Sequence, residues 1–280
     1  MKLVTVVIPC YNYGNFISEA INSVLKQTLL DYEIVIVDDG SDEATLNVLK
    51  RWEGLSNIRI FYIQNGGPSR ARNFGISQAK SKYILPLDAD DLIEESYLEK
   101  AVSAMEDNQN LGIVYCRANF FGAINGPWNL PTYQFPDILY QNCIFVTSMF
   151  RLEDWALVKG FDENFLDEWE DFDFWLKIIG LGREVYQIPE TLFFYRKGHG
   201  SRTVRKHLEL LPIYSRLVKN HRNLYQENVI FFIEQLLIKN KEYELLEIDR
   251  MKLLKSKEFR LGYYLLHWFD LLKNKLKRYK

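Results

Sequence analysis

Short apolar runs alternate with helix-like segments through the first 116 residues, and this alternation restricts the fold more than any other feature. Apolar spacing predicts strands at 3–9, 33–39, 58–63, 83–91 and 111–116, and helices at 16–27, 41–52, 69–79 and 95–107, the second with Ser41 as its N-cap. Strands and helices in this order form βαβ units with a mostly parallel sheet. Runs such as VTVVI and IVIV indicate strands buried on both faces. The first half is therefore predicted to be an α/β domain, a Rossmann-like sheet flanked by helices.

The pattern is less regular after residue 117. Residues 120–142 are rich in aromatic residues, Pro, Gly and Asn, and we expect a long loop over a cleft, where binding groups often lie. Further elements are predicted as a strand at 144–151, a short helix after it, a helix at 169–182 and extended chain at 185–196. From residue 204 the chain is charged and helical in pattern. These boundaries predict a catalytic domain over 1–203 and a helical extension over 204–280.

Composition excludes several classes of protein. The formal net charge of -2 argues against a nucleic-acid-binding protein, which would carry a basic excess. Cys10, Cys116 and Cys143 form no CxxC motif and are predicted to be reduced core thiols, as in a cytoplasmic protein. We expect no signal peptide, because the apolar start continues into a turn, and no membrane-spanning helix, because no apolar run reaches about 18 residues.

The C-terminal segment 251–280 is basic, with nine Lys or Arg and two acids, a net charge of +7. It contains the block FRLGYYLLHWFDLL at 259–272. Basic residues around an aromatic segment are typical of a helix that lies on an anionic membrane surface. The same pattern suits a helix packed on the domain with a solvated basic end. The sequence leaves both interpretations open, and with them a location at the inner face of the cytoplasmic membrane.

Polar residues follow the predicted strands at the positions where ligands bind in open α/β sheets, beyond the carboxyl ends of the strands. The first strand ends at Pro9-Cys10-Tyr11-Asn12, the second at Asp38-Asp39, the third before Gly66-Gly67 and the fourth at Asp88-Ala89-Asp90-Asp91. We expect these four ends to form one site.

Asp88 and Asp90 are two residues apart in extended chain, so their carboxylates can point the same way. Such a pair suits Mg²⁺ or Mn²⁺, which binds one or two carboxylates together with phosphate oxygens. The alternative is a helix N-cap with Asp91 and Glu94 in the first turn. His199, in a polar loop, is a further candidate for contact with the metal or the diphosphate, although a lone loop histidine is more often solvated.

Two further segments carry candidate nucleotide contacts. A carboxylate of the Asp38-Asp39 pair can accept the imino N–H of uracil, with Tyr11 stacked on the base. Arg70 and Arg72 lie at a predicted helix start, where anions bind readily, and two residues apart they cannot share a face. We assign Arg72 to the site and Arg70 to solvent.

The segment at 168–173 has four acids interleaved with aromatic residues. Displacement of a nucleotide diphosphate from a sugar needs a base that takes the proton of the acceptor, and Asp171 is the candidate. The alternative is an amphipathic helix with Phe172 and Trp175 in the core and its acids in water.

Taken together, the motifs resemble the glycosyltransferase family 2 enzymes, which have the GT-A fold. The segments that carry the resemblance occur in the family's order over about residues 1–200: VVIPCYNYGNFISEAINSVLKQT, EIVIVDDGSDE, NGGPSRARNFGI, YILPLDADD and GFDENF…WEDFDFW. The resemblance implies an inverting transfer from a nucleotide-sugar donor, often a UDP-sugar, with Mg²⁺ or Mn²⁺, to a glycan or lipid-linked acceptor. His199 and Ser201 match a looser loop motif of the family.

The resemblance also implies residue roles. It places the base at Asp171 in the Glu170-Asp171 pair and the metal at Asp90, with Asp88 near the ribose and metal. The full set of candidate nucleotide-binding residues is Pro9, Tyr11, Asn12, Asp38, Asp39, Gly67, Arg72, Asp88 and Ala89.

Two other functions remain as alternatives. A sugar-nucleotide pyrophosphorylase would need a glycine-rich basic loop after the first strand, where this chain has Pro9-Cys10-Tyr11-Asn12-Tyr13. A non-catalytic nucleotide-sugar-binding or scaffold protein would not need acids at 88, 90 and 171. Release of UDP from a UDP-sugar distinguishes an enzyme from such a binder.

Overall fold

The computed structural model describes residues 2–165, 169–198 and 210–256. The chain forms two compact units, Met1–Glu227 and Asn228–Lys280. Packing of the first unit thus continues past residue 203, through two helices that follow the predicted catalytic domain. The separation into a catalytic domain over 1–203 and an extension over 204–280 stays a prediction.

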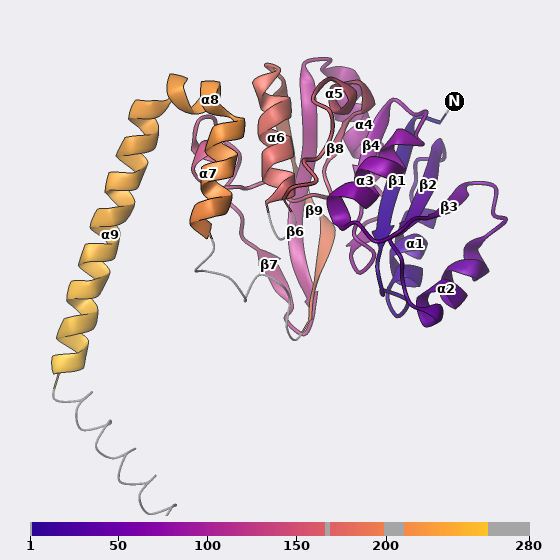
Figure 1. Ribbon diagram of the computed structural model, residues 1–280, viewed down its shortest axis with the longest axis horizontal. Coiled ribbons are helices and arrows are strands. Elements are labelled where there is room, and N and C mark those ends of the chain that lie inside the picture. Colours follow the sequence, from indigo (N-terminus) through magenta and orange to yellow (C-terminus); the bar gives the residue numbers. More distant parts are fainter. Residues whose placement is uncertain (1, 166–168, 199–209, 257–280) are drawn as a thin grey trace, which may run out of the picture. The chain divides into compact units, whose positions relative to one another are not determined.

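One twisted sheet forms the centre of the first unit (Figure 1). Among the described residues it has nine strands in the order β3-β2-β1-β4-β8-β6-β9-β5, with β7 paired to β6. Their bounds are β1 Val4–Cys10, β2 Tyr32–Asp38, β3 Ile58–Tyr62, β4 Tyr83–Pro86, β5 Leu92–Ile93, β6 Leu111–Gly122, β7 Gly126–Trp128, β8 Met149–Arg151 and β9 Glu184–Lys197.

The first four strands are parallel, in agreement with the βαβ pattern of the sequence. β6 and β9 are also parallel to each other, whereas β8 runs antiparallel to both of its neighbours, β4 and β6. The prediction of a mostly parallel sheet flanked by helices is confirmed. Strands β1 and β2 are buried along almost their whole length, as their continuous apolar runs indicated.

Helices flank this sheet close to the predicted positions. Their bounds are α1 Ile17–Leu25, α2 Glu43–Leu49, α3 Pro68–Ser77, α4 Tyr97–Asp107, α5 Leu152–Leu157, α6 Glu170–Gly180, α7 Leu210–Asn220 and α8 Arg222–Glu227. One predicted cap was wrong. Asp42 rather than Ser41 is the N-cap of α2, and its carboxylate accepts a hydrogen bond from the Thr45 amide at 2.8 Å.

Helix α3 lies very close to the sheet because it carries a glycine at the contact. A Cβ at Gly75 would lie 2.5 Å from Cγ1 of Val7 and 2.9 Å from Cγ2 of Val37. Both distances are shorter than side-chain packing allows, so only glycine permits this approach. The first turn of α3 is thereby held beside the ends of β1 and β2.

The aromatic region at 120–142 is more regular than expected. Strand β6 extends to Gly122 and turns into β7, so the loop prediction was wrong for the first part of this region. Aromatic rings from β6, β7 and β9 pack together here, with Trp128 stacked on Phe120 at 5.2 Å and tilted against Tyr195 at 4.9 Å between ring centroids. These contacts pack β7 against the ends of β6 and β9.

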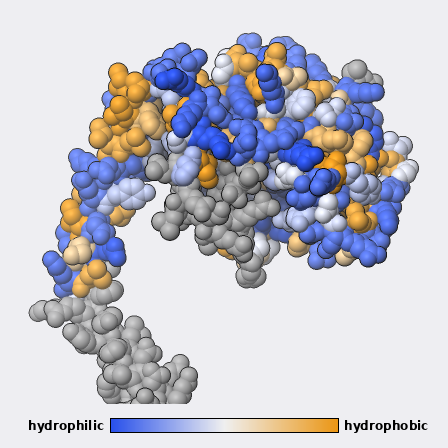
Figure 2. Space-filling model, in the orientation of Figure 1, coloured by the Kyte–Doolittle hydropathy of each residue, from blue (hydrophilic) through white to orange (hydrophobic). Residues whose placement is uncertain are grey.

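The second unit contains α9, Val229–Lys255. Many of its apolar side chains are exposed, including Ile230, Leu237 and Leu246, and its first turns form an apolar surface (Figure 2). No helix in the described part of the chain has the length and apolar content needed to cross a bilayer. Residues 257–280, with the predicted aromatic block, lie outside the described residues.

Candidate active site at the carboxyl edge of the sheet

Two loops that follow β1 and β2 are joined by hydrogen bonds. Asn12, whose φ of 60° is in the left-handed region that asparagine tolerates, donates its amide to Oγ of Ser41 at 2.9 Å. Its side-chain oxygen accepts from the Asp42 amide at 2.8 Å. Tyr11 beside it is 47% exposed, so its ring is available to a ligand.

Asp39 holds the glycine turn before α3. Its two carboxylate oxygens accept hydrogen bonds from the amides of Gly66 and Gly67, each at 2.8 Å. Burial raises the pKa of Asp39, while these two hydrogen bonds act in the opposite direction. Gly67 has a φ of 89° and precedes Pro68, which begins the helix. Asp39 therefore fixes the entry to α3 as well as standing at the predicted nucleotide site.

Asp38, at the end of β2, is buried. Oδ2 accepts from the Ser41 amide at 3.2 Å, whereas Oδ1 has no hydrogen-bond partner among the described residues. A buried carboxylate oxygen without a partner is unfavourable unless something else supplies a donor. The sequence could not indicate which of the two adjacent acids would have an oxygen without a hydrogen-bond donor, because that depends on the Gly66-Gly67 turn.

Arg72 lies at the centre of the site. Its side chain is only 3% exposed, and its guanidinium donates to Oδ1 of Asp88 at 2.7 Å and to Oε1 of Glu170 at 2.9 Å. Burial would lower the pKa of Arg72, but Asp88 and Glu170 outweigh burial and raise it, so the group stays charged. Arg70 is exposed, as predicted.

The acids after β4 occupy different environments. Asp88 is 31% exposed, and Asp91 is buried. Oδ1 of Asp91 accepts from the amide of Arg196 at 2.8 Å, and Nε of Arg196 donates to the carbonyl of Asp90 at 2.7 Å. Burial raises the pKa of Asp91, and the charges of Asp88 and Asp90 raise it further. Helix α4 begins only at Tyr97, so the alternative of an N-cap with Asp91 in its first turn was wrong.

Glu170 and Asp171 begin α6, directly after Trp169, which has a φ of 73°. Oδ1 of Asp171 accepts from the Phe172 amide at 2.6 Å and from Nδ2 of Asn142 at 3.4 Å. The side chain keeps partial exposure, yet desolvation by the surrounding protein, followed by the charge of Glu170, raises the pKa of Asp171 to about 7. A carboxylate of this kind can take a proton near neutral pH.

The carboxylates of this site can bind a divalent cation if a bound ligand and water supply the other oxygen ligands. The described residues contain no group of three or more His, Cys, Asp or Glu side chains arranged to hold a metal ion. Asp88 and Asp90 would supply two carboxylates, and Mg²⁺ or Mn²⁺ commonly completes its shell with phosphate oxygens and water. His199, the further candidate for contact with the metal or the diphosphate, lies outside the described residues.

The structure brings together residues that are far apart in the sequence. Through Arg72, the acid motif after β4 contacts the acid pair of α6, while Asn12, Asp38, Asp39 and Gly67 gather at the neighbouring strand ends. Asn142 and Arg196 were not among the candidate residues predicted from the sequence. Arg196 could have been suspected as a cation near the end of a strand, whereas nothing local distinguishes Asn142 within its loop.

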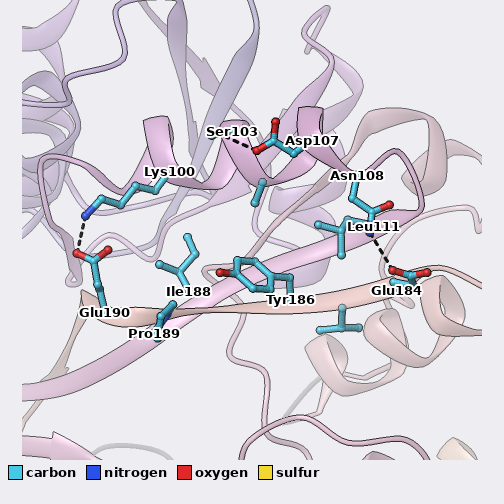
Figure 3. A pocket seen from close by; sticks show the side chains of 12 residues that line it. Lys100, Ser103, Asp107, Asn108, Leu111, Glu184, Tyr186, Ile188, Pro189 and Glu190 are labelled. Carbon is cyan, nitrogen blue, oxygen red and sulfur yellow. Dashed lines mark hydrogen bonds and ion pairs between the residues drawn. The ribbon is translucent and has the colours of Figure 1, made fainter.

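A separate cavity of about 670 Å³ lies among α4, β6 and β9 (Figure 3). Its lining includes Tyr186 and Ile188, and an ion pair between Lys100 and Glu190 at its border. None of the acids described above lines this cavity. Geometry and charge therefore place the candidate active site at the strand ends rather than in this cavity.

Comparison with known proteins identifies the family. The sequence profile described as "Glycosyl transferase family 2" matches residues 5–187. Chondroitin synthase of Pasteurella multocida (strain Pm70) is 32% identical over 215 residues, which are 75% of this chain and 22% of that protein. Glycosyltransferase GlyG of Streptococcus pneumoniae serotype 4 (strain ATCC BAA-334 / TIGR4) is 28% identical over 222 residues, 71% of this chain and 72% of GlyG. The chain thus spans about a fifth of the synthase.

Among solved structures, residues 1–349 of S. aureus TarS in complex with UDP-GlcNAc are similar in fold. The TM-score is 0.66 at 22% sequence identity, and the match covers 81% of this chain and 70% of the TarS chain. The predicted GT-A type of α/β fold is confirmed.

We expect Asp171→Asn to gain stability relative to the wild type as pH rises. The pKa of Asp171 is raised to about 7 in the folded protein from an ordinary value of 3.8, so the folded state binds more protons between these values. The contribution of Asp171 to stability then falls across this window, by ~1.4 kcal/mol per pKa unit at most, less for a partly exposed group. Asparagine does not titrate, and its oxygen can accept the same two hydrogen bonds. Urea unfolding at pH 5 and pH 8 measures the difference.

The exposed Asp107→Asn is the control, and its stability relative to the wild type should change little with pH. A pH-independent difference between Asp171→Asn and the wild type would show that the pKa of Asp171 is not raised.

Proposed function

The chain belongs to glycosyltransferase family 2, and from this premise we propose that it transfers a sugar from a UDP-sugar to a hydroxyl or amine of a glycan or lipid-linked acceptor, in the synthesis of a cell-surface polysaccharide or glycoconjugate. Support for UDP-sugars comes from TarS, which binds UDP-GlcNAc, and support for polysaccharide synthesis comes from the similarity to chondroitin synthase.

The observation that carries the proposal is the double ion pair of Arg72. One buried guanidinium joins Asp88, on the side of the proposed donor diphosphate, to Glu170, the neighbour of the proposed base. A cation placed between these groups keeps two acid clusters close together in a region where their mutual repulsion would otherwise separate them. A protein that only binds a nucleotide sugar would not need the Glu170-Asp171 pair beside Asp88.

In the proposed step, the acceptor oxygen or nitrogen attacks the anomeric carbon from the side opposite the diphosphate. The bond from the anomeric carbon to the diphosphate oxygen breaks, and its electron pair leaves with UDP. The acceptor proton passes to the carboxylate of Asp171. The configuration at the anomeric carbon is inverted, because attack and departure occur on opposite faces.

Asp171 must be ionised to act as a base. Because its pKa is raised to about 7, the carboxylate is a stronger base than an ordinary aspartate and is still largely ionised slightly above neutral pH. The hydrogen bonds from Asn142 and from the Phe172 amide fix one oxygen, which leaves the other oxygen for the acceptor. We expect the rate to rise with pH through the neutral range.

We further propose that Asp90 and Asp88 hold Mn²⁺ or Mg²⁺, a cation that neutralises negative charge on the diphosphate when it is bound. Arg196 supports this role because its contacts with Asp90 and Asp91 hold the turn that carries both acids. Asp38 and Asp39 with Tyr11 are the proposed contacts for the uracil and ribose, and Asp38 has a buried acceptor oxygen available.

The tail is a separate proposal. We propose that residues 251–280 bind an anionic membrane surface, which would place the site near lipid-linked acceptors at the inner membrane face. The net charge of +7 and the aromatic block support it. The exposed apolar side chains of α9 add apolar surface next to this segment in the sequence.

Asp171→Asn should bind UDP and fail to turn over the donor. We expect UDP release from a UDP-sugar to fall by at least ~100-fold, the usual contribution of a general base, while Kd for UDP stays within about threefold. A coupled assay for UDP with UDP-GlcNAc, UDP-glucose and UDP-galactose measures the rate, and calorimetry measures binding. Asp107→Asn is the matched control. Full activity in Asp171→Asn would rule out this base.

Asp90→Asn should remove the metal dependence of UDP binding. Calorimetric titration with UDP, with and without Mn²⁺, should show a gain of affinity from Mn²⁺ in the wild type and almost none in the variant, because one of two carboxylate ligands is lost. An equal gain in both proteins would exclude Asp90 as a ligand.

A chain that ends at Arg250 should lose affinity for anionic vesicles. We expect the full chain to sediment with vesicles that contain phosphatidylglycerol at low salt, to be released by higher salt, and the shortened chain to stay in solution. Equal sedimentation of both proteins would show that the tail is not the membrane contact.

A further inference from the structure

Helices α7 and α8 contact each of the three segments that surround Asp171. His221, at the junction of the two helices, is the first contact. Its Nε2 lies 2.9 Å from Oδ1 of Asp173, a residue of α6 that follows Asp171 by two positions and is fully buried. Because an ionised carboxylate only accepts, the imidazole donates this hydrogen bond.

Asp173 has two other polar partners, a hydrogen-bond donor and an ion-pair partner. Nδ2 of Asn220, the last residue of α7, lies 2.9 Å from Oδ1, and Nζ of Lys177 lies 2.8 Å from Oδ2. Burial would raise the pKa of Asp173, but the hydrogen bond from His221, together with Lys177 and Asn220, outweighs burial and lowers it. A carboxylate that is buried, ionised and bound from two helices ties the first turn of α6 to the α7–α8 junction.

The second contact precedes the acid pair. Trp169 is the left-handed residue directly before Glu170, and its ring packs edge-on against Tyr214 of α7, with 5.5 Å between centroids. It also packs against Phe172, at 5.8 Å. A left-handed conformation is unfavourable for a bulky residue, so the surrounding contacts must maintain it. Helix α7 supplies one of them.

The third contact is with the loop that carries Asn142. The carbonyl of Leu139, three residues earlier, accepts hydrogen bonds from the hydroxyls of Tyr225 at 2.8 Å and Tyr214 at 3.1 Å. Asn142 in turn donates to Asp171. The α7–α8 segment thus holds the helix that bears the base, the residue before it and the loop that binds it.

We propose that α7 and α8 are a positioning element for Asp171, with His221 and Tyr225 as positioning residues that set the distance from the carboxylate to the acceptor without touching substrate. This inference rests on the proposed function, since it assumes that Asp171 is the base. It assigns a role to a part of the chain that begins beyond the end of the family match at residue 187.

A purely structural role for these contacts predicts different kinetics for the variants. Buried charged networks often add little stability compared with apolar packing of similar volume. If His221 only stabilised the fold, its loss would lower the melting temperature without separating kcat from KM. If it positions the base, kcat falls while donor binding persists, since small displacements of reacting groups cost about 100-fold or less in rate.

The test compares His221→Phe, which keeps a planar ring and removes the donor, with His221→Gln, which can again present an N–H to Asp173. We expect kcat for UDP release to fall about tenfold in His221→Phe, with KM for the UDP-sugar and Kd for UDP within about threefold of the wild type, and recovery to within about threefold in His221→Gln. UDP-GlcNAc, UDP-glucose and UDP-galactose are the donors tested, and UDP is the binding probe.

Tyr225→Phe removes one hydroxyl from Leu139 and provides an independent variant if His221→Phe fails to fold. We expect a smaller loss of kcat with unchanged Kd for UDP. Tyr243→Phe, on an exposed face of α9, is the matched control and should behave as the wild type.

The outcomes separate the two proposals. If the wild type releases no UDP, or if Asp171→Asn is fully active, the proposed function fails. If those two proteins behave as expected, an unchanged kcat in a folded His221→Phe overturns the positioning role. A kcat of His221→Gln as low as that of His221→Phe overturns it as well. Where only Tyr225→Phe folds, an unchanged kcat in that variant overturns it.

Discussion

The ion pairs of Arg72 are the interaction on which the site depends. A guanidinium that is 3% exposed has lost nearly all contact with water, a loss that is compensated only when the charge is paired. Asp88 and Glu170 provide that pairing, and together they keep the pKa of Arg72 above its ordinary value despite its burial. Removal of Arg72 would leave both carboxylates without their shared cation, and removal of both acids would leave a buried guanidinium unpaired. The two acid segments are therefore held together by their electrostatics, and the sheet brings them close enough for this to operate.

The backbone prepares this contact in two places. Gly75 lets α3 approach β1 and β2 so closely that the first turn of the helix stands at the strand ends, and Asp39 fixes the turn by which α3 begins. On the opposite side, Trp169 in a left-handed conformation sets the direction in which α6 leaves its loop. Arg72 and Glu170 each lie within a few residues of such a constraint. Their meeting is consequently determined by local geometry on both sides rather than by the long side chains alone.

Much of the fold and most of the site were accessible from the sequence, because both arise from local patterns. Apolar runs and helical spacing located the parallel strands, and acids directly after those runs located the site edge. Features that depend on long-range pairing were not accessible. Asp91 is buried under Arg196, which is more than 100 residues away, and no local signal separates that position from a helix cap. The hydrogen-bond partners of Asp38 and Asp39 likewise differ because of the Gly66-Gly67 turn, although the two residues are adjacent.

The raised pKa of Asp171 shows how stability and chemistry conflict at this site. The ordinary tendency of a helix N-terminus is to stabilise a carboxylate and lower its pKa. Here burial and the neighbouring Glu170 reverse that tendency and raise the pKa to about 7, so the ionised form is kept at a cost to the folded state. Such a cost persists only if the surrounding structure prevents the side chain from turning to water. The contacts of α6 with Asn142 and His221, and of Trp169 with Tyr214, oppose that movement, and this is the physical reason why helices outside the sheet belong to the proposed site.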